Sequence, residues 1–328
     1  GDDCSGFHIE KEETEDEKMG IIRGICISEQ RGTQKKEVDS ATLKENWGIE
    51  GDAHGGLWHR QGSLLSFEKI EAFRKKGAAV DFGAFGENLI VEGIDFRQLP
   101  VGTRFRIGKA ELEMTQIGKE CHSHCAIYQQ VGDCIMPREG VFAEVRKPGM
   151  IQKGDSVEVL PPKEDRPLTA AVLTLSDQGA KGLRKDESGP VIVEELEKAG
   201  YRIVETLLLP DEMALLKKHL IRLADQRQVN LILTTGGTGF SERDCTPEAT
   251  LAVATRNAPG IAKAIRVGSL QITRRAMLSR EASVIRNKTL IVNLPGSPKA
   301  VRECLSLVLD QLEHGIRILT GRDGECAR

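Results

Sequence analysis

The sequence contains no uninterrupted apolar run of the roughly 18 residues that a membrane-spanning helix needs. It also lacks a basic leader, because its first residues, GDDCSGFHIEKEETEDEK, are acidic. These two absences predict a cytoplasmic protein with no membrane partner. Cysteines stay reduced in that compartment, so the eight cysteines of the chain are expected to be free thiols rather than a disulfide framework.

A large excess of one charge is missing as well. The chain has 46 basic and 49 acidic residues, a net charge of −3 and a pI near 6.2, which gives no reason to expect nucleic acid as a partner. Apolar residues make up 39% and charged residues 29%, as in ordinary globular proteins. A length of 328 residues exceeds the roughly 100–200 residues of one domain, so two domains are expected.

Composition shifts along the chain predict where these domains lie. Residues 1–18 are acidic, have almost nothing to bury, and are predicted to be a disordered tail. The segment LPPKEDRP, residues 160–167, combines prolines with charges between two strand-like runs. We therefore predict a first domain at 19–160, a linker at 161–167 and a second domain at 168–328.

The two domains differ in their predicted secondary structure. In the first, short β-favouring runs at 21–28, 89–92, 103–107, 110–117 and 156–160 surround one helix at 66–76, which predicts a small, mostly-β barrel. In the second, strands at 169–175, 201–208, 229–235 and 289–294 alternate with helices at 190–199, 211–227, 247–256 and 298–320. Such alternation predicts a three-layer α/β domain with a mostly parallel sheet, whose ligands bind at the carboxyl ends of the strands.

One strand of the second domain leads into the glycine-rich segment TTGGTG. Glycines allow backbone N–H groups to approach an anion closely, and threonine hydroxyls add donors. The candidate ligand-binding residues in this segment are Thr235, Gly236, Gly237, Thr238 and Gly239. The alternative is an ordinary turn in which Thr246 is the N-cap of the next helix and Pro247 its first residue.

Other strand-to-helix loops add hydroxyls and carboxylates. The first loop carries Ser176, Asp177 and Asp186, or else serves helix capping by Ser188. Asp211 opens the next helix, where capping is the alternative to ligand binding. The last loop contributes Pro295, Gly296 and Ser297, and Ser297 could cap a final helix that starts at Pro298 and ends at Gly321.

A basic stretch borders these loops. Residues 260–288 contain seven lysines or arginines and one glutamate, including Arg274, Arg275 and Arg280. A solvated surface is the usual explanation, but a phosphate-bearing substrate would explain both the charges and the loops. Carboxylates beside such a substrate suggest Mg²⁺, which prefers oxygen ligands and bridges to phosphates.

Taken together, the segments LSD, DESGP, LLLPDE, LILTTGGTGF, RDCTPEAT, PGIAKAIR, AMLSR and TLIVNLPGSPKA resemble the molybdopterin adenylyltransferase (MogA/MoaB) family over nearly all of residues 168–320. The resemblance implies an enzyme that uses Mg-ATP to adenylylate the terminal phosphate of molybdopterin. It implies that Ser176, Ser279 and Asn293 contact the pterin. It also implies that the loop at Gly236–Gly239 lies against phosphates, that Asp186, Asp211 and Asp244 serve Mg²⁺ and the nucleotide in catalysis, and that the protein is a homotrimer.

The first domain carries a cluster of cysteines and histidines in GKECHSHCAIYQQVGDC, namely Cys121, His122, His124, Cys125 and Cys134. Structural zinc is one interpretation, although no second C-x-x-C pair completes a site. A reactive thiol is favoured, because Lys119 and the histidines would stabilise a thiolate. Buried, inert cysteines remain the third interpretation.

The segments GIEGDAHGG, FGENLIVEGID, VGTRFRIGKAELEMTQIGKECHSHC and GVFAEVRKPGMIQKGDSVEVL are similar to the MOSC domain of molybdenum cofactor sulfurases over residues 20–160. This resemblance implies that Cys125 carries sulfur or ligates molybdenum, with Cys121 as the alternate ligand. Both domains then belong to molybdenum cofactor biosynthesis, with recipient molybdoenzymes as further partners. The competing hypothesis is a non-catalytic carrier or storage protein for molybdopterin or its cofactor, against which the three aspartates argue.

Overall fold

The computed structural model describes residues 19–77, 79–120 and 133–322. The chain divides into two compact units, Gly1–Pro161 and Pro162–Arg328. No helix in the described ranges is long and apolar enough to cross a membrane. The two-domain fold class predicted from the sequence, a β barrel followed by a parallel α/β domain, is confirmed.

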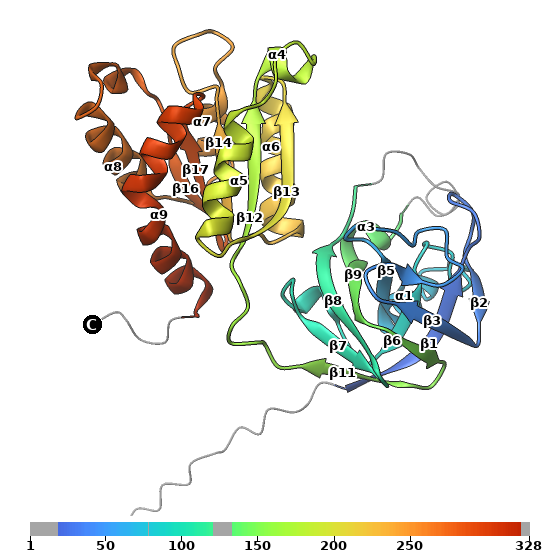
Figure 1. Ribbon diagram of the computed structural model, residues 1–328. Helices are drawn as coiled ribbons and strands as arrows, with labels where there is room; N and C mark the ends of the chain where they lie inside the picture. Colours follow the sequence, from blue (N-terminus) through green and yellow to red (C-terminus); the bar gives the residue numbers. More distant parts are fainter. Residues whose placement is uncertain (1–18, 78, 121–132, 323–328) are drawn as a thin grey trace, which may run out of the picture. The chain divides into compact units, whose positions relative to one another are not determined.

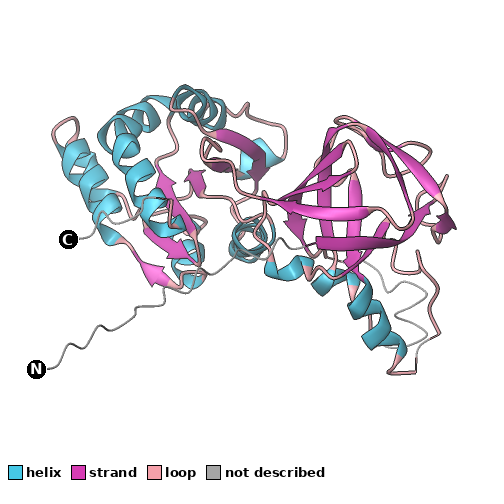
Figure 2. Ribbon diagram, turned by 90° about the horizontal axis from the view of Figure 1, so that it is seen from below, coloured by secondary structure: helices cyan, strands magenta, loops and turns pink. Residues whose placement is uncertain are grey.

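The N-terminal unit is a closed antiparallel barrel with one parallel pair (Figures 1 and 2). Its strands, in the order in which they pair, are β11 (Ser156–Leu160), β7 (Arg104–Ile107), β8 (Ala110–Ile117), β9 (Val141–Lys147), β5 (Gly62–Ser66), β6 (Leu89–Glu92) and β1 (Met19–Ile27). Pairing of β1 with β11, which joins Met19 to Glu158, closes the barrel. The two runs that close it lie at opposite ends of the domain sequence, so no local pattern predicts their pairing.

Smaller elements complete this unit. A short strand, β2 (Lys36–Val38), pairs with β1, and a second sheet joins β3 (Ser40–Lys44), β4 (Gly48–Ile49) and β10 (Gly149–Gln152). The helical segments are α1 (Phe67–Arg74), η1 (Phe96–Gln98) and α3 (Met136–Glu139). The predicted helix at 66–76 is therefore α1, while strands β2–β5, β9 and β10 are additions to the predicted set.

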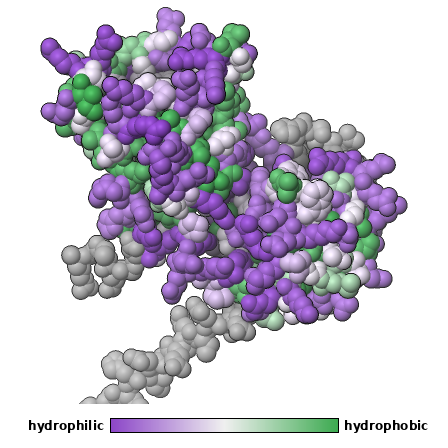
Figure 3. All heavy atoms as spheres, viewed as in Figure 1, coloured by the Kyte–Doolittle hydropathy of each residue, from purple (hydrophilic) through white to green (hydrophobic). Residues whose placement is uncertain are grey.

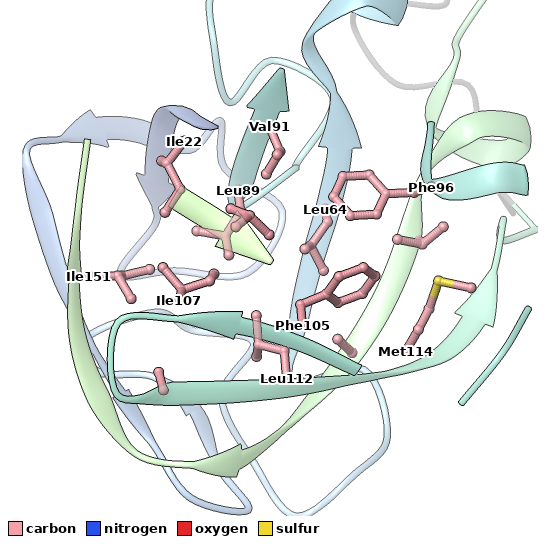
Figure 4. Close-up of a cluster of buried hydrophobic side chains, with 14 of the residues drawn as sticks. Ile22, Leu64, Leu89, Val91, Phe96, Phe105, Ile107, Leu112, Met114 and Ile151 are labelled. Carbon is pink, nitrogen blue, oxygen red and sulfur yellow. The ribbon is translucent and has the colours of Figure 1, made fainter. Parts of the chain in front are cut away.

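Alternating side chains build two cores on either side of the barrel wall. Inward-facing residues, such as Leu64, Phe96 and Phe105, fill the barrel (Figure 4). The next residue, Leu65, points to the other side of the wall and packs with Ile70 and Phe73 of α1. This second core lies beneath the helix and supports the polar cavity described below.

The C-terminal unit is a six-stranded sheet between helices (Figure 1). Its strands, in pairing order, are β13 (Arg202–Leu209), β12 (Thr169–Leu175), β14 (Leu231–Thr235), β17 (Thr289–Leu294), β16 (Ser283–Arg286) and β15 (Arg256–Asn257). The pairs from β13 to β17 are parallel, and the last two pairs are antiparallel. Because β12 lies between β13 and β14, the strand order reverses there, which is where such sheets bind ligands.

Helices cover both faces of this sheet. One face packs against α5 (Ser188–Lys198), α8 (Pro259–Leu270) and α9 (Pro298–Thr320). The other packs against α6 (Met213–Ile221), its π-helical continuation η2 (Arg222–Gln226), and α7 (Thr246–Ala252). The short helices α4 (Asp177–Ala180) and η3 (Arg274–Leu278) complete the unit. The sequence did not lead us to predict β15, α8 and β16. In the chain, these three elements follow β14 and precede β17.

Candidate active site

The loops after β12 and β13 are joined by two aspartates that bind each other's backbone. Asp177 Oδ1 accepts from the N–H of Asp211, and Asp211 Oδ2 accepts from the N–H of Asp177, both at 3.0 Å. Helix α6 begins at Met213 with Glu212 as its N-cap residue, so Asp211 does not cap it. The capping alternative for Asp211 is therefore wrong, and its carboxyl group links the two loops instead.

The second carboxyl oxygen of Asp211 is buried. Within the described residues, Asp211 Oδ1 has no hydrogen-bond partner. It faces the glycine loop, because a Cβ atom built on Gly237 would lie 3.1 Å from it. Burial raises the pKa of Asp211, and the negative charges of Asp177 and Asp244 raise it further. A buried acceptor without a donor is costly, so this oxygen is suited to a cation or a bound water.

Arg243 connects a third loop to this pair. Its Nε and Nη2 atoms donate to the two carboxyl oxygens of Asp177, each at 2.9 Å. This bidentate ion pair lowers the pKa of Asp177 to about 2, and the hydrogen bond from Arg243 is the largest cause. The loops after β12, β13 and β14 are thus fastened together at Asp177.

The glycine-rich loop has a shape that only glycine allows. Gly236 and Gly237 have φ angles of 90° and 67°. Cβ atoms at these positions would lie 2.4 Å from the carbonyl oxygen of Leu175 and 2.3 Å from Thr246 Oγ1, respectively. Any other residue would therefore be both strained and obstructed. The loop backbone packs directly against the end of β12 and the start of α7.

Thr246 is not the N-cap residue of α7, as the turn interpretation expected. It is the first helical residue, Cys245 is the N-cap, and Pro247 is second. Its hydroxyl donates to the carbonyl oxygen of Gly236 at 2.9 Å, and its N–H donates to that of Gly237 at 3.1 Å. Thr246 therefore shapes the glycine loop.

Asp244 lies next to the same loop and does not cap α7 either. Its Oδ2 atom accepts from the N–H of Ser241 at 2.9 Å, and a Cβ atom on Gly239 would lie 2.9 Å from that oxygen. Arg280 holds this segment from outside, because its guanidinium donates to the carbonyl oxygens of Gly239 at 2.7 Å and Asp244 at 2.8 Å. Arg280 also pairs with Glu248.

Asp186 belongs to a separate group at the start of α5. It accepts from Thr174 Oγ1 at 2.7 Å and from the N–H groups of Ser188 and Gly189 at 3.1 and 3.0 Å. Asp186 thus caps this helix. Ser188, which was the capping alternative, instead donates its hydroxyl hydrogen to the carbonyl oxygen of Gly296 at 2.7 Å.

A cavity of about 170 Å³ opens beside Asp186. Its lining includes Ser176, Arg184, Lys185, Thr235, Gly236 and Gly296. The first residues of α5 and α9 also line it, and helix N-termini carry partial positive charge. Ser176 caps α4 by accepting from Gly179 N–H at 3.0 Å, while Ser297 caps α9 as expected. The cavity is suited to an anionic group.

The structure places the other candidate residues as follows. Thr235 and Thr238 are buried, and Thr235 Oγ1 donates to the carbonyl oxygen of Pro295 at 2.6 Å. Asn293 is fully buried, and its amide donates to Thr234 and Thr250 and accepts from Ala282 N–H. Its side chain thus links β17 to β14 and α7, and the pterin contact that the resemblance implied stays a prediction. Ser279 is half-buried and its carbonyl oxygen accepts from Arg266 at 3.1 Å.

The three aspartates do not form a common metal site. Within the described ranges, no three histidine, cysteine, aspartate or glutamate side chains lie close enough to hold an ion. Asp186 is engaged at α5, whereas Asp211 and Asp244 flank the glycine loop. The roles toward Mg²⁺ and the nucleotide that the resemblance implies for Asp186, Asp211 and Asp244 stay predictions.

In the N-terminal unit, Cys121, His122, His124 and Cys125 lie outside the described residues, so their expected roles remain predictions. Cys134 is described and is buried. It lines a cavity of about 640 Å³. Other residues of this cavity include Lys35, His54, Trp58, Arg60, Lys119 and Glu120. The buried polar residues beneath this cavity, Lys35 and Asp52, were not predicted from the sequence.

Sequence reasoning missed Arg243 and Thr174 in the second unit. Arg243 belongs to the segment RDCTPEAT, but its partner Asp177 is 66 residues away. Thr174 is the penultimate residue of β12, and a polar side chain at the end of an otherwise apolar strand was the available signal.

Comparison with known proteins yields matches to both units. The family described as "Probable molybdopterin binding domain" matches residues 171–314, and the MOSC domain matches residues 50–158. The molybdopterin adenylyltransferase of Helicobacter pylori (strain ATCC 700392 / 26695) is 41% identical over 152 residues, which is 46% of this chain and 86% of that protein. The molybdopterin adenylyltransferase of Escherichia coli (strain K12) is 42% identical over 155 residues, covering 45% and 80% of the two chains.

Among solved structures, the molybdopterin biosynthesis enzyme MoaB from Thermus thermophilus is 43% identical to this chain. The match covers 47% of this chain and 97% of that one, with a TM-score of 0.45. These relatives all match one part of the chain, whereas the MOSC match lies in the other.

Proposed function

Because the chain belongs, through its C-terminal unit, to the molybdopterin adenylyltransferase family and carries a MOSC domain before it, we propose that this unit adenylylates molybdopterin with Mg-ATP as the second substrate. The buried, unpartnered Oδ1 atom of Asp211 carries this proposal. An acceptor in that position, with two further carboxylates raising its pKa, favours a bound cation.

The residues present fit Mg²⁺ delivered with a nucleotide. Mg²⁺ is commonly held by one or two carboxylates together with substrate phosphates and waters, so three protein ligands are not required. Asp211 and Asp244 are the two carboxylates beside the glycine loop, and they would hold the ion. Bound there, Mg²⁺ would offset the repulsion between the two phosphate-bearing substrates.

The chain's own residues would bind and orient the phosphates. Gly236 of the glycine-rich loop lines a cavity, so its backbone would lie beside a phosphate bound there. The cavity of about 170 Å³ next to it offers Lys185, Arg184 and two helix N-termini to an anion. In this proposal Asp186 positions α5, Thr246 shapes the glycine loop, and Asn293 fixes the sheet edge behind it.

A pyrophosphate assay tests the proposal against the carrier hypothesis. The protein is incubated with ATP, Mg²⁺ and molybdopterin, and pyrophosphate release is followed over many turnovers. An adenylyltransferase releases pyrophosphate continuously, and the release requires both molybdopterin and Mg²⁺. Binding of molybdopterin without any pyrophosphate would favour the non-catalytic carrier.

For the N-terminal unit, we propose binding of molybdenum or its cofactor through the Cys125 thiolate, with Cys121 as the alternate ligand. The support is the MOSC match together with the cluster of thiols and imidazoles in the sequence. Replacing Cys125 with Ser should abolish metal content, measured on the purified protein, while pyrophosphate release persists. Loss of metal only in the Cys121→Ser variant would assign the other cysteine.

A homotrimer formed by the C-terminal unit is part of the same proposal. Its support is an apolar groove of about 380 Å³ lined by residues of α8 and α9, including Ile261, Leu307 and Leu312. Helix α8 also carries exposed apolar side chains, among them Val267 and Leu270. Hydrophilic side chains cover much of the face seen in Figure 3, and patches of hydrophobic ones interrupt them. Sedimentation equilibrium would test the trimer by giving three times the chain mass of 36.0 kDa.

A further inference from the structure

A buried ion pair lies beneath the cavity of the N-terminal unit. Lys35 Nζ is 2.6 Å from Asp52 Oδ1, and the two side chains are 2% and 0% exposed. Asp52 also accepts from the N–H groups of Ser28 at 2.9 Å and His54 at 3.3 Å. Burial alone would raise the pKa of Asp52, but the nearby side chains of His54 and Lys35 and the N–H group of Ser28 hold it well below its usual range. Asp52 is therefore charged, and Lys35 is its counter-ion.

The same lysine fixes a histidine that lines the cavity. Lys35 Nζ lies 3.1 Å from His54 Nδ1, whereas Asp52 Oδ2 is 3.6 Å from that nitrogen, too far for a hydrogen bond. A lysine ammonium group has three donors and no acceptor, so His54 Nδ1 must be the acceptor in this contact. The ring proton of His54 is then on Nε2. The arrangement Asp52–Lys35–His54 thus selects one tautomer of the imidazole.

The remaining edge of this ring is available to a ligand. The His54 side chain is 35% exposed and lines the cavity. Across the described residues, His54 Nε2 makes no hydrogen bond to the protein. The backbone at His54 is held as well, because its carbonyl oxygen accepts from Trp58 Nε1 at 2.8 Å.

The Nε2–H group of His54 is a donor and therefore takes an acceptor. Arg60 and Lys119 line the cavity together with Asp81 and Glu120, while the charge of Lys35 is matched by Asp52. Asp52 is fully enclosed and already bonded, so it does not compete for Nε2–H. A hydrogen bond to an ionised acceptor is stronger than one to a neutral acceptor, which favours an anionic ligand group at this donor.

We infer that His54 is a ligand-binding residue of the N-terminal cavity, where its Nε2–H donates to an oxoanion group of the ligand, and that Lys35 and Asp52 are its positioning residues. This inference does not depend on the adenylylation proposed for the C-terminal unit. It also needs neither Cys121 nor Cys125, because all three side chains lie elsewhere in the sequence.

Nuclear magnetic resonance of the full chain labelled with ¹⁵N-histidine tests the tautomer. In the neutral ring, long-range ¹H–¹⁵N correlations should place the single ring proton of His54 on Nε2. In Lys35→Met, which removes the donor, the signal should move toward the Nδ1–H form. Detection of the Nδ1–H form of the neutral ring in the unsubstituted protein would overturn the inference.

Titration with inorganic phosphate, a simple oxoanion, tests the binding role independently of Lys35. The side-chain N–H of Gln reaches the position of Nε2–H, whereas that of Asn reaches the position of Nδ1. His54→Asn should therefore weaken phosphate binding about tenfold or more, and His54→Gln should retain most of it. A parallel titration with molybdate shows whether the site binds the two oxoanions with different affinities.

The matched control is His59→Gln. His59 contacts Gln116 at 2.9 Å and does not line the cavity, so its replacement should leave phosphate binding unchanged. Equal binding by His54→Asn and His54→Gln, or no phosphate binding by the unsubstituted protein, would contradict the proposed role of Nε2–H.

Discussion

The two units of this chain differ in what shifts the pKa of individual titratable groups. In the C-terminal unit, carboxylates and glycines lie on loops at one edge of a sheet, and the neighbouring Arg243 lowers the pKa of Asp177 to about 2. In the N-terminal unit, burial raises the pKa of Glu87 to about 7 and of Cys26 to about 12. A counter-ion therefore sets the charge of Asp177, whereas burial favours the neutral forms of Glu87 and Cys26.

The largest effect should come from disturbing the buried ion pair of the barrel. Lys35→Met leaves Asp52 buried without its counter-ion, and loss of one partner of such a pair costs roughly 3–5 kcal/mol of unfolding free energy. Urea unfolding of the N-terminal unit measures this loss. The double variant Lys35→Met/Asp52→Asn removes both charges and should recover much of it. A loss below about 1 kcal/mol would mean that the pair behaves like an exposed one.

Removing a loop carboxylate should instead affect turnover. Asp244→Asn can still accept from Ser241 N–H, so the loop and the melting temperature should be retained. The lost charge should lower the rate of pyrophosphate release on the order of 10²-fold, with a similar but weaker effect for Asp211→Asn. Steady-state kinetics with Mg-ATP measures the rate. A normal rate combined with a lowered melting temperature would show that Asp244 is structural.

The fold class and the loop positions were predictable because they depend on local periodicity. Apolar runs such as 169–175 and 289–294 identified the strands, and parallel strands bring their carboxyl ends to one edge. Helix capping was less predictable. Asp211, Ser188 and Thr246 all had suitable residue types, but the actual caps depend on where each helix starts, which differs by one or two residues.

Contacts between distant residues could not be predicted from spacing. Arg243 reaches Asp177 across 66 positions, and Lys35 reaches Asp52 across 17 positions that span the second sheet of the N-terminal unit. The closure of the barrel by β1 and β11 is of the same kind. Asn293 within β17 makes contacts of the same kind, because its amide donates to Thr234 and Thr250, which are 59 and 43 positions away.

Removing the exposed ion pair between Arg243 and Asp177 should change the stability of the protein less. Arg243→Met should raise the pKa of Asp177 from about 2 toward its ordinary value of 3.8. Since the folded pKa is depressed, the pair contributes stability above the unfolded pKa, and this contribution is lost as pH falls through about 2. The stability difference between the protein and its variant should therefore shrink between pH 4 and pH 2. Carboxyl NMR titration and urea unfolding at each pH measure both quantities.

Arg243→Lys is the matched control for this pair. It keeps the charge but cannot form two parallel hydrogen bonds, so the pKa of Asp177 should lie between those of the protein and Arg243→Met. A pKa of Asp177 that stays near 2 in Arg243→Met would assign the depression to the Asp211 backbone instead.

The smallest effect should follow from separating the two units. Each has its own cores, and the chain divides between Pro161 and Pro162, within the segment 161–167 that was predicted to be a linker. Chains ending at Lys163 and starting at Glu164 should each melt cooperatively, at temperatures close to those of the two transitions of the full chain. A chain that starts at Leu168 should be slightly less stable, because it lacks the carbonyl oxygen of Arg166, which accepts from Arg322 at 2.9 Å. The difference between the two starts should be about 1 kcal/mol, the net contribution of one hydrogen bond. Calorimetry of the three chains measures it, and aggregation of both separated units would contradict the proposed boundary.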